Sequence, residues 1–166
     1  MKYYAGIGSR ETPDDVLERM TNYAVVLAER GYTLRSGAAA GADTAFERGA
    51  SAFPERKAIY LPWVGFNGHQ DGIIVGEDER LREIAVRHHP AWEKCFPGAR
   101  ALHTRNVAQI LGHTEPIVLS DFVLCWTLKA RGGGGTGQAI RIARTYGVPV
   151  YDLANAQNNF EKDWLY

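Results

Sequence analysis

The feature that most constrains the fold is a regular alternation of short β-rich runs with longer amphipathic segments. The amphipathic segments carry apolar residues at helical spacing. The β-rich runs are Tyr3–Ile7, Tyr32–Arg35, Ala58–Leu61, Phe122–Trp126 and Val148–Tyr151, and the helical segments are Asp14–Arg30, Ala42–Ala52, Arg100–Leu111 and Gln138–Tyr146. This alternation predicts an α/β fold with a mostly parallel sheet and helices on both faces. Right-handed crossovers then give a Rossmann-like three-layer sandwich with a strand order near 3-2-1-4-5.

The length of the chain, 166 residues, predicts a single domain. Its periodicity lapses after the third strand, where four glycines alternate with aromatic and polar residues. We therefore expect an irregular insertion at about residues 63–98, which includes a charged segment, Glu77–His88, that can form a helix. The three apolar residues Trp164-Leu165-Tyr166 after a polar tail are expected to dock on the rest of the chain or on a second copy.

The charge balance restricts the partners. Lys+Arg and Asp+Glu both number 19, so the formal net charge is zero. Domains that wrap long DNA by charge alone are usually strongly basic, which argues against that class but not against a local basic patch. With no signal-peptide pattern and no apolar run of about 20 residues, we expect a cytoplasmic protein that does not engage a membrane.

The cysteines and histidines show no ligand spacing in the sequence. Cys95 and Cys125 form no CxxC pair, and none of the five histidines belongs to an HExxH or similar motif. We therefore expect no metal and no cofactor, with the histidines solvated or structural.

Three glycine-rich loops follow predicted strands and should meet at one edge of the sheet, where ligands bind in open α/β folds. They are Gly8-Ser9-Arg10-Glu11-Thr12, Ser36–Asp43 and Arg131–Gly137. Glycine lets backbone N–H groups approach an anion, and the following helix presents its positive end. The four consecutive glycines Gly132–Gly135 carry an entropy cost that a mere connector rarely bears. Together the loops predict a phosphate-binding site, which reconciles a neutral protein with an anionic ligand.

Several side chains near these loops have two interpretations. Arg10 and Arg35 end strands beside the expected crevice and could contact a phosphate, although Arg10 could instead pair with Glu11. Asp43 could cap its helix, or it could orient the glycine loop or a ribose hydroxyl. Thr136 could bind phosphate, cap the following helix, or do both. Trp63, Phe66 and Trp92 could stack on a base or pack the insertion onto the sheet.

The loops also carry a family resemblance. Ser36-Gly37-Ala38-Ala39-Ala40-Gly41-Ala42-Asp43 resembles the SGxAxGxD motif of the DNA-processing protein A (DprA/Smf) family, and Gly6-Ile7-Gly8-Ser9-Arg10 is similar to its first-strand segment. Arg105-Asn106 is similar to that family's R-N-R segment, and Gly134-Gly135-Thr136-Gly137 stands where it carries another glycine motif. The resemblance covers about residues 4–150. It extends to the Rossmann-like SLOG superfamily, which includes the Lonely Guy (LOG) hydrolases.

The resemblance implies a non-catalytic protein that binds a nucleotide or single-stranded nucleic acid and self-associates. The alternatives are a hydrolase of the N-glycosidic bond of nucleoside 5'-monophosphates and a sensor of a small nucleotide. A LOG-type hydrolase would need a glutamate where this chain has Ala139, so catalysis would fall to Glu11 or Asp43. The predicted ligand-binding residues are Gly8, Ser9, Arg10, Arg35, Ser36, Gly37, Gly41, Asp43, Arg105, Asn106, Gly133, Gly134, Gly135 and Thr136.

Overall fold

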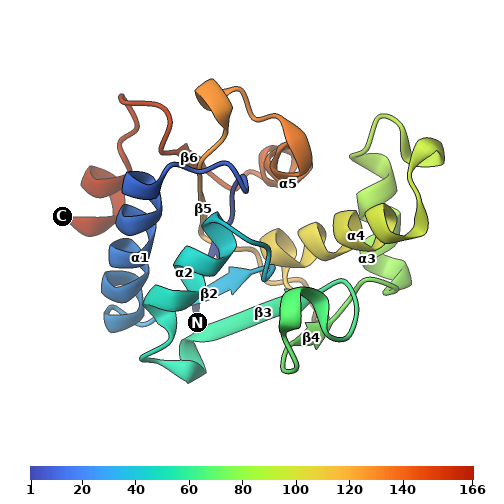
Figure 1. Ribbon diagram of the computed structural model, residues 1–166, viewed down its shortest axis with the longest axis horizontal. Helices are drawn as coiled ribbons and strands as arrows, with labels where there is room; N and C mark the ends of the chain where they lie inside the picture. The colour runs from blue at the N-terminus through green and yellow to red at the C-terminus, as the bar shows by residue number, and fades with distance from the viewer.

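The computed structural model describes residues 1–166 and contains one six-stranded sheet in which every pairing is parallel (Figure 1). The strand order is β4-β3-β2-β1-β5-β6. The strands are β1 (Lys2–Gly6), β2 (Tyr32–Ser36), β3 (Lys57–Leu61), β4 (Ile73–Ile74), β5 (Phe122–Cys125) and β6 (Val150–Asp152). The predicted order of the five strands is confirmed, and the two-residue β4 from the irregular insertion extends the sheet beside β3.

Helices cover both faces of the sheet. They are α1 (Asp14–Glu29), α2 (Ala42–Ala50), α3 (Glu79–Arg87), α4 (Pro97–Leu111) and α5 (Gly134–Thr145), with short 3-10 turns in the connections. The helices α1 and α2 lie together on one side, and α3, α4 and α5 lie on the other (Figure 1). The predicted three-layer sandwich is confirmed. None of these helices is both long and apolar enough to cross a bilayer.

The alternation of side chains along the strands builds two cores, one on each face of the sheet. In β1, Tyr4 packs into the core under α1 and α2, whereas Ala5 packs into the core under α3, α4 and α5. In β5, Phe122 and Val123 divide in the same way. Because both faces of the sheet are buried, the sequences of the central strands are almost continuously apolar.

Two helix starts lie three or more residues from their predicted positions. The helix α4 begins at Pro97, three residues before the expected Arg100, because proline is well suited to a first helical position. The helix α5 begins at Gly134, so the second half of the glycine run forms its first turn instead of a loop. The exposed glycines therefore form the start of α5.

The C-terminal tail docks within the chain. The ring of Trp164 lies 4.4 Å from that of Phe122, and its Nε1 donates a hydrogen bond to the hydroxyl of Tyr151. Arg30 at the end of α1 donates to the carbonyls of Trp164 and Leu165. Tyr166 alone is left almost fully exposed.

Candidate functional site

A cavity of about 670 Å³ lies where the loops after β1, β2 and β5 converge on α4 and the start of α5. Eleven residues singled out in the sequence line it: Gly8, Ser9, Arg10, Glu11, Asp43, Arg105, Asn106, Gly133, Gly134, Gly135 and Thr136. Residues separated by more than 120 positions thus meet at the edge of the sheet where ligands bind in such folds.

The start of α5 presents free backbone donors to this cavity. The first N–H groups of any helix lack an acceptor within the helix, and here no side chain caps them. Gly133, Gly134 and Gly135 are exposed, and a Cβ added to any of them would meet no atom within 4 Å. At Gly134 the backbone itself favours glycine, because its φ is +66°. At Gly133 and Gly135 nothing inside the protein requires a small residue, whereas an anion approaching the backbone would.

The base of the glycine loop is fixed, although its tip is open. Thr127 lies two residues after β5. It donates its hydroxyl to Asp152 and accepts a hydrogen bond from Gly132 N–H at 2.9 Å. The carboxylate of Asp152 also accepts from Thr127 N–H at 3.1 Å. Neither residue was singled out in the sequence, since a lone threonine and a lone aspartate carry no signal before the strands are paired.

Arg105 lies at the centre of the buried part of the site. It is 7% exposed, donates Nη1–H to the carbonyl oxygen of Gly37, and donates Nε–H to Asn106 Oδ1 at 3.2 Å. A Cβ on Gly37 would stand 2.2 Å from Arg105 Nη1, so the guanidinium occupies the space that any other residue would fill. Burial lowers the pKa of Arg105, and the nearby Asp43 carboxylate opposes that change.

Asp43 orients the second loop from within. Its Oδ2 accepts a hydrogen bond from Ala39 N–H at 3.2 Å and lies 4.0 Å from Arg105 Nη1. Burial raises its pKa from 3.8 to about 6, although Arg105 and the backbone donors act in the opposite direction. Of the two roles considered for Asp43, the hydrogen bond from Ala39 N–H supports orientation of the loop, and the position of Asp43 in the first turn of α2 is also favourable for its charge.

Asn106 ties α4 to the glycine loop. Its Nδ2 donates to the carbonyl of Gly135 and to Gln138 Oε1, both at 3.2 Å. Gln138 Nε2 in turn donates to the carbonyl of Ala85, which fixes the orientation of the Gln138 amide. Asn106 therefore positions the start of α5.

Arg10 is the exposed cation of the cavity. It forms no ion pair or hydrogen bond through its side chain, so the alternative of a salt bridge to Glu11 is not supported. Its backbone is held against Gly41, whose φ is +86° and where a Cβ would stand 2.9 Å from Arg10 Cα. Ser9 stabilises the same turn, because its Oγ accepts from Glu11 N–H at 3.0 Å.

Four predicted ligand residues do not line the cavity: Arg35, Ser36, Gly37 and Gly41. Arg35 is 3% exposed and donates to the carbonyl of Val118 at 2.6 Å and to Ser120 Oγ at 3.2 Å. Its guanidinium also lies 3.9 Å from the ring centre of Tyr3. The expectation of a phosphate contact at Arg35 is thus corrected. The long Arg35 side chain extends away from the cavity and places its guanidinium against the segment between α4 and β5. Ser36 donates to the carbonyl of Gly6 at 2.6 Å and joins β1 to β2.

The cavity also has walls that the sequence did not predict. Ala99, Leu102 and His103 of α4, with His89 from the insertion, complete it opposite the glycine loops. Phe66 lines the cavity, whereas Trp92 is buried and Trp63 packs edge-on against Phe66 at 5.4 Å. Of the three aromatic residues considered for base stacking, Phe66 alone reaches the cavity. Ala139 faces it too, and so the position of the LOG-type glutamate carries no carboxylate.

No protein-family model and no curated protein sequence matches this chain. Among solved structures, it is similar to DNA processing protein A from Helicobacter pylori, whose description gives it a single-stranded DNA binding mode. The TM-score is 0.54 with 15% sequence identity, over 98% of this chain and 73% of that one. At this identity the similarity establishes the shared fold.

Proposed function

We propose that this protein binds single-stranded nucleic acid, with one nucleotide in the cavity and its phosphate at the start of α5. The observation that carries the proposal is the convergence of the uncapped start of α5, its exposed glycines and the unpaired Arg10 on one cavity. Pockets that hold small ligands measure roughly 300–1,000 Å³. At about 670 Å³, the cavity suits one nucleotide unit and is too small for a duplex.

The chemistry around the cavity fits a flexible polynucleotide. Backbone N–H groups and Arg10 would hold a phosphate without a strongly basic surface. Phe66 offers an aromatic face for an unstacked base, a sequence-tolerant contact typical of single-strand binding. The structural neighbour from Helicobacter pylori is described as binding single-stranded DNA, which supports this choice of ligand.

The proposal is tested by fluorescence anisotropy of a labelled single-stranded oligonucleotide, with the duplex of the same sequence and nucleoside monophosphates as competitors. We expect salt-sensitive binding that neither competitor displaces at equal nucleotide concentration, because successive phosphates add contacts. Binding that mononucleotides displace fully would instead identify a small-nucleotide sensor. The absence of any binding at low salt would refute the proposal.

One observation favours the alternative of an N-glycosidic hydrolase. Asp43 lines the cavity with a pKa of about 6, close to neutral pH, as general acids and bases require. If the protein turns over nucleoside monophosphates, free base should accumulate, and Asp43→Asn should abolish its release while binding persists. Chromatography of the products distinguishes the two functions. Self-association, also expected from the resemblance, is measured separately by light scattering after gel filtration.

A further inference from the structure

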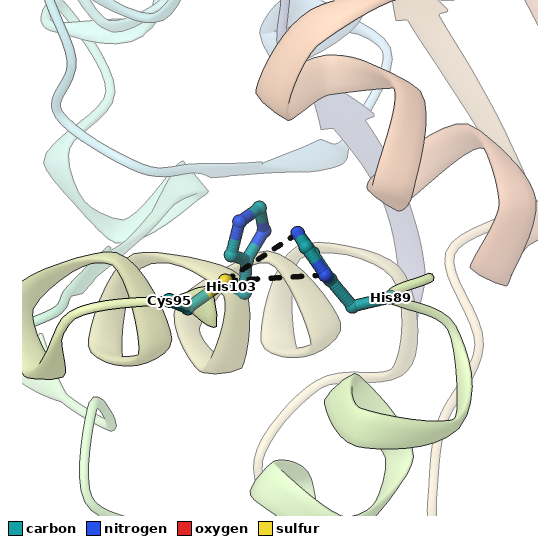
Figure 2. Close-up of side chains that lie close together, drawn as sticks. All are labelled: His89, Cys95 and His103. Carbon is teal, nitrogen blue, oxygen red and sulfur yellow. Dashed lines mark hydrogen bonds between the residues drawn. The ribbon is translucent and has the colours of Figure 1, made fainter. Parts of the chain in front are cut away.

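A cluster of three metal-ligand side chains lies at the wall of the cavity, outside the glycine loops. His89 lies two residues after α3, Cys95 lies two residues before α4, and His103 lies within α4. Their ligand atoms all lie within 4.8 Å of one another, and each side chain is partly exposed. Figure 2 shows the thiol of Cys95 facing the ring of His89, with the ring of His103 beside them.

We propose that His89, Cys95 and His103 form a Zn²⁺ site at the wall of the cavity. Tetrahedral zinc with Zn–S of about 2.3 Å and Zn–N of about 2.0–2.1 Å places its sulfur and nitrogen ligands about 3.6 Å apart. Cys95 Sγ lies 3.7 Å from His89 Nε2, close to that spacing. A separation of 4.8 Å, the upper limit for this cluster, needs to shorten by about 1.2–1.5 Å to reach tetrahedral spacing, a change within reach of partly exposed side chains.

The hydrogen bond of His103 fixes the tautomer that leaves one ring nitrogen free to bind a metal. Gln138 presents its carbonyl oxygen to His103 Nδ1 at 2.9 Å, and the orientation of this amide is fixed by Asn106 and by the carbonyl of Ala85. Nδ1 of His103 is therefore the protonated nitrogen, and the lone pair of Nε2 is free. Zinc-bound histidines are held in the same way, by an oxygen acceptor on the nitrogen that does not bind the metal.

His89 and Cys95 change on metal binding. His89 Nδ1 accepts from Ala91 N–H at 3.1 Å, so the neutral ring carries its proton on Nε2. Nε2 is the ring nitrogen nearer to Cys95 Sγ, at 3.7 Å against 3.9 Å for Nδ1. Coordination through Nε2 moves that proton to Nδ1 and breaks the bond to Ala91, while the Cys95 thiol releases its proton to solvent. A two-histidine, one-cysteine set of borderline and soft donors favours Zn²⁺ over Mg²⁺ or Ca²⁺.

The fourth coordination position would face the cavity. His89 and His103 both line the cavity, so a metal held between them stands at its surface. Three protein ligands with one open position are typical of zinc sites that bind water or a substrate atom, whereas structural sites use four. Neither the start of α5 nor Arg10 contributes a ligand, so metal binding and oligonucleotide binding can be measured separately.

The test uses untagged, full-length protein stripped with a chelator and then titrated with Co²⁺ and Zn²⁺ alone. We expect one Co²⁺ per chain, with a near-ultraviolet thiolate-to-cobalt band and the intense visible bands of a four-coordinate centre, both abolished by Zn²⁺. In Cys95→Ser the thiolate band should vanish. In His103→Phe the Zn²⁺ affinity should fall by more than the about 10–100-fold that loss of an outer partner costs.

The control is His88→Asn, next to His89 in the chain, whose ring instead contacts Ile84 and Thr145. It should bind Zn²⁺ as the wild type does. The proposal is overturned if the wild type shows no thiolate-to-cobalt band, or if Zn²⁺ affinity is equal in the wild type, Cys95→Ser and His103→Phe. Since the wild-type spectrum alone can refute it, the test does not depend on the folding of any variant. Oligonucleotide binding by the stripped protein reports on the proposed function separately.

Discussion

The two glycine-rich loops after β2 and β5 look alike in the sequence, yet they use glycine for opposite reasons. In the loop after β2, Gly37 and Gly41 are packed so tightly that a Cβ would overlap Arg105 or the backbone of Arg10. In the loop after β5, Gly133–Gly135 face open space at the cavity. Gly37 and Gly41 in the first loop serve the fold, whereas Gly133 and Gly135 in the second loop leave room for something outside the protein. Substitutions in the first loop should therefore change the stability of the fold, and substitutions in the second loop should change ligand binding.

The largest expected effect is on the packed loop. Gly37→Ala should lower the free energy of unfolding by about 3 kcal/mol, because the new methyl group displaces a buried guanidinium from its carbonyl partner. Urea denaturation followed by circular dichroism measures this change. A loss below about 0.5 kcal/mol would mean that Arg105 does not hold the position described.

The second effect also belongs to the packed loop. Because burial raises the pKa of Asp43 to about 6, the folded state holds its proton more tightly than the unfolded state, and stability falls as pH rises. The whole contribution is about 3 kcal/mol, of which about 1 kcal/mol falls between pH 5 and pH 7. Asp43→Asn should remove this component, so the stability difference between variant and wild type should shift toward the variant on going from pH 5 to pH 7. An unchanged difference would show that Asp43 titrates normally.

The third effect belongs to the open loop. Gly135→Ala should leave stability unchanged or raise it by up to about 1 kcal/mol, since alanine favours the first turn of α5. Its affinity for a single-stranded oligonucleotide should fall about tenfold, which is about 1.4 kcal/mol, because the methyl group enters the space at the helix start. Gly37→Ala and Gly135→Ala make the same chemical change, so a loss of stability in the first and a loss of affinity in the second would separate the roles of the two loops. Unchanged affinity would remove the start of α5 from the binding site.

The smallest effect tests the cation between the two loops. Arg10→Ala should weaken oligonucleotide binding by about fivefold, or about 1 kcal/mol, as expected for an exposed charge. The slope of log affinity against log salt should decrease by about 0.7, the contribution of one single-strand phosphate contact. Arg87→Ala is the matched control, since Arg87 is exposed, unpaired and outside the cavity. Equal effects of the two variants would point to nonspecific attraction.

Much of the site followed from the sequence because its signals are local. A glycine run after an apolar strand implies a strand-to-helix turn, and parallel strands bring such turns to one edge. Arg10, Asp43 and the Gly133–Thr136 segment were expected at this edge on these grounds and from the family resemblance, and they line the cavity. The wall opposite them could not be predicted, because the irregular insertion has no periodicity from which to orient His89 or Cys95.

Arg35 shows a different limit. Its position at the end of β2 was right, but the direction of its side chain depended on partners more than 80 residues away. A long, flexible side chain follows whichever acceptors the fold brings near, and strand position does not specify them.

The strand order, the burial of both faces of the sheet and the edge at which the glycine loops meet could all be predicted from the sequence. Those features depend on the period of apolar residues and on backbone chirality, which are written into each segment. Which glycines are packed, which are open, and that His89, Cys95 and His103 meet became visible in the folded chain alone. Those outcomes depend on distances between segments, and such distances exist only after the two cores have closed.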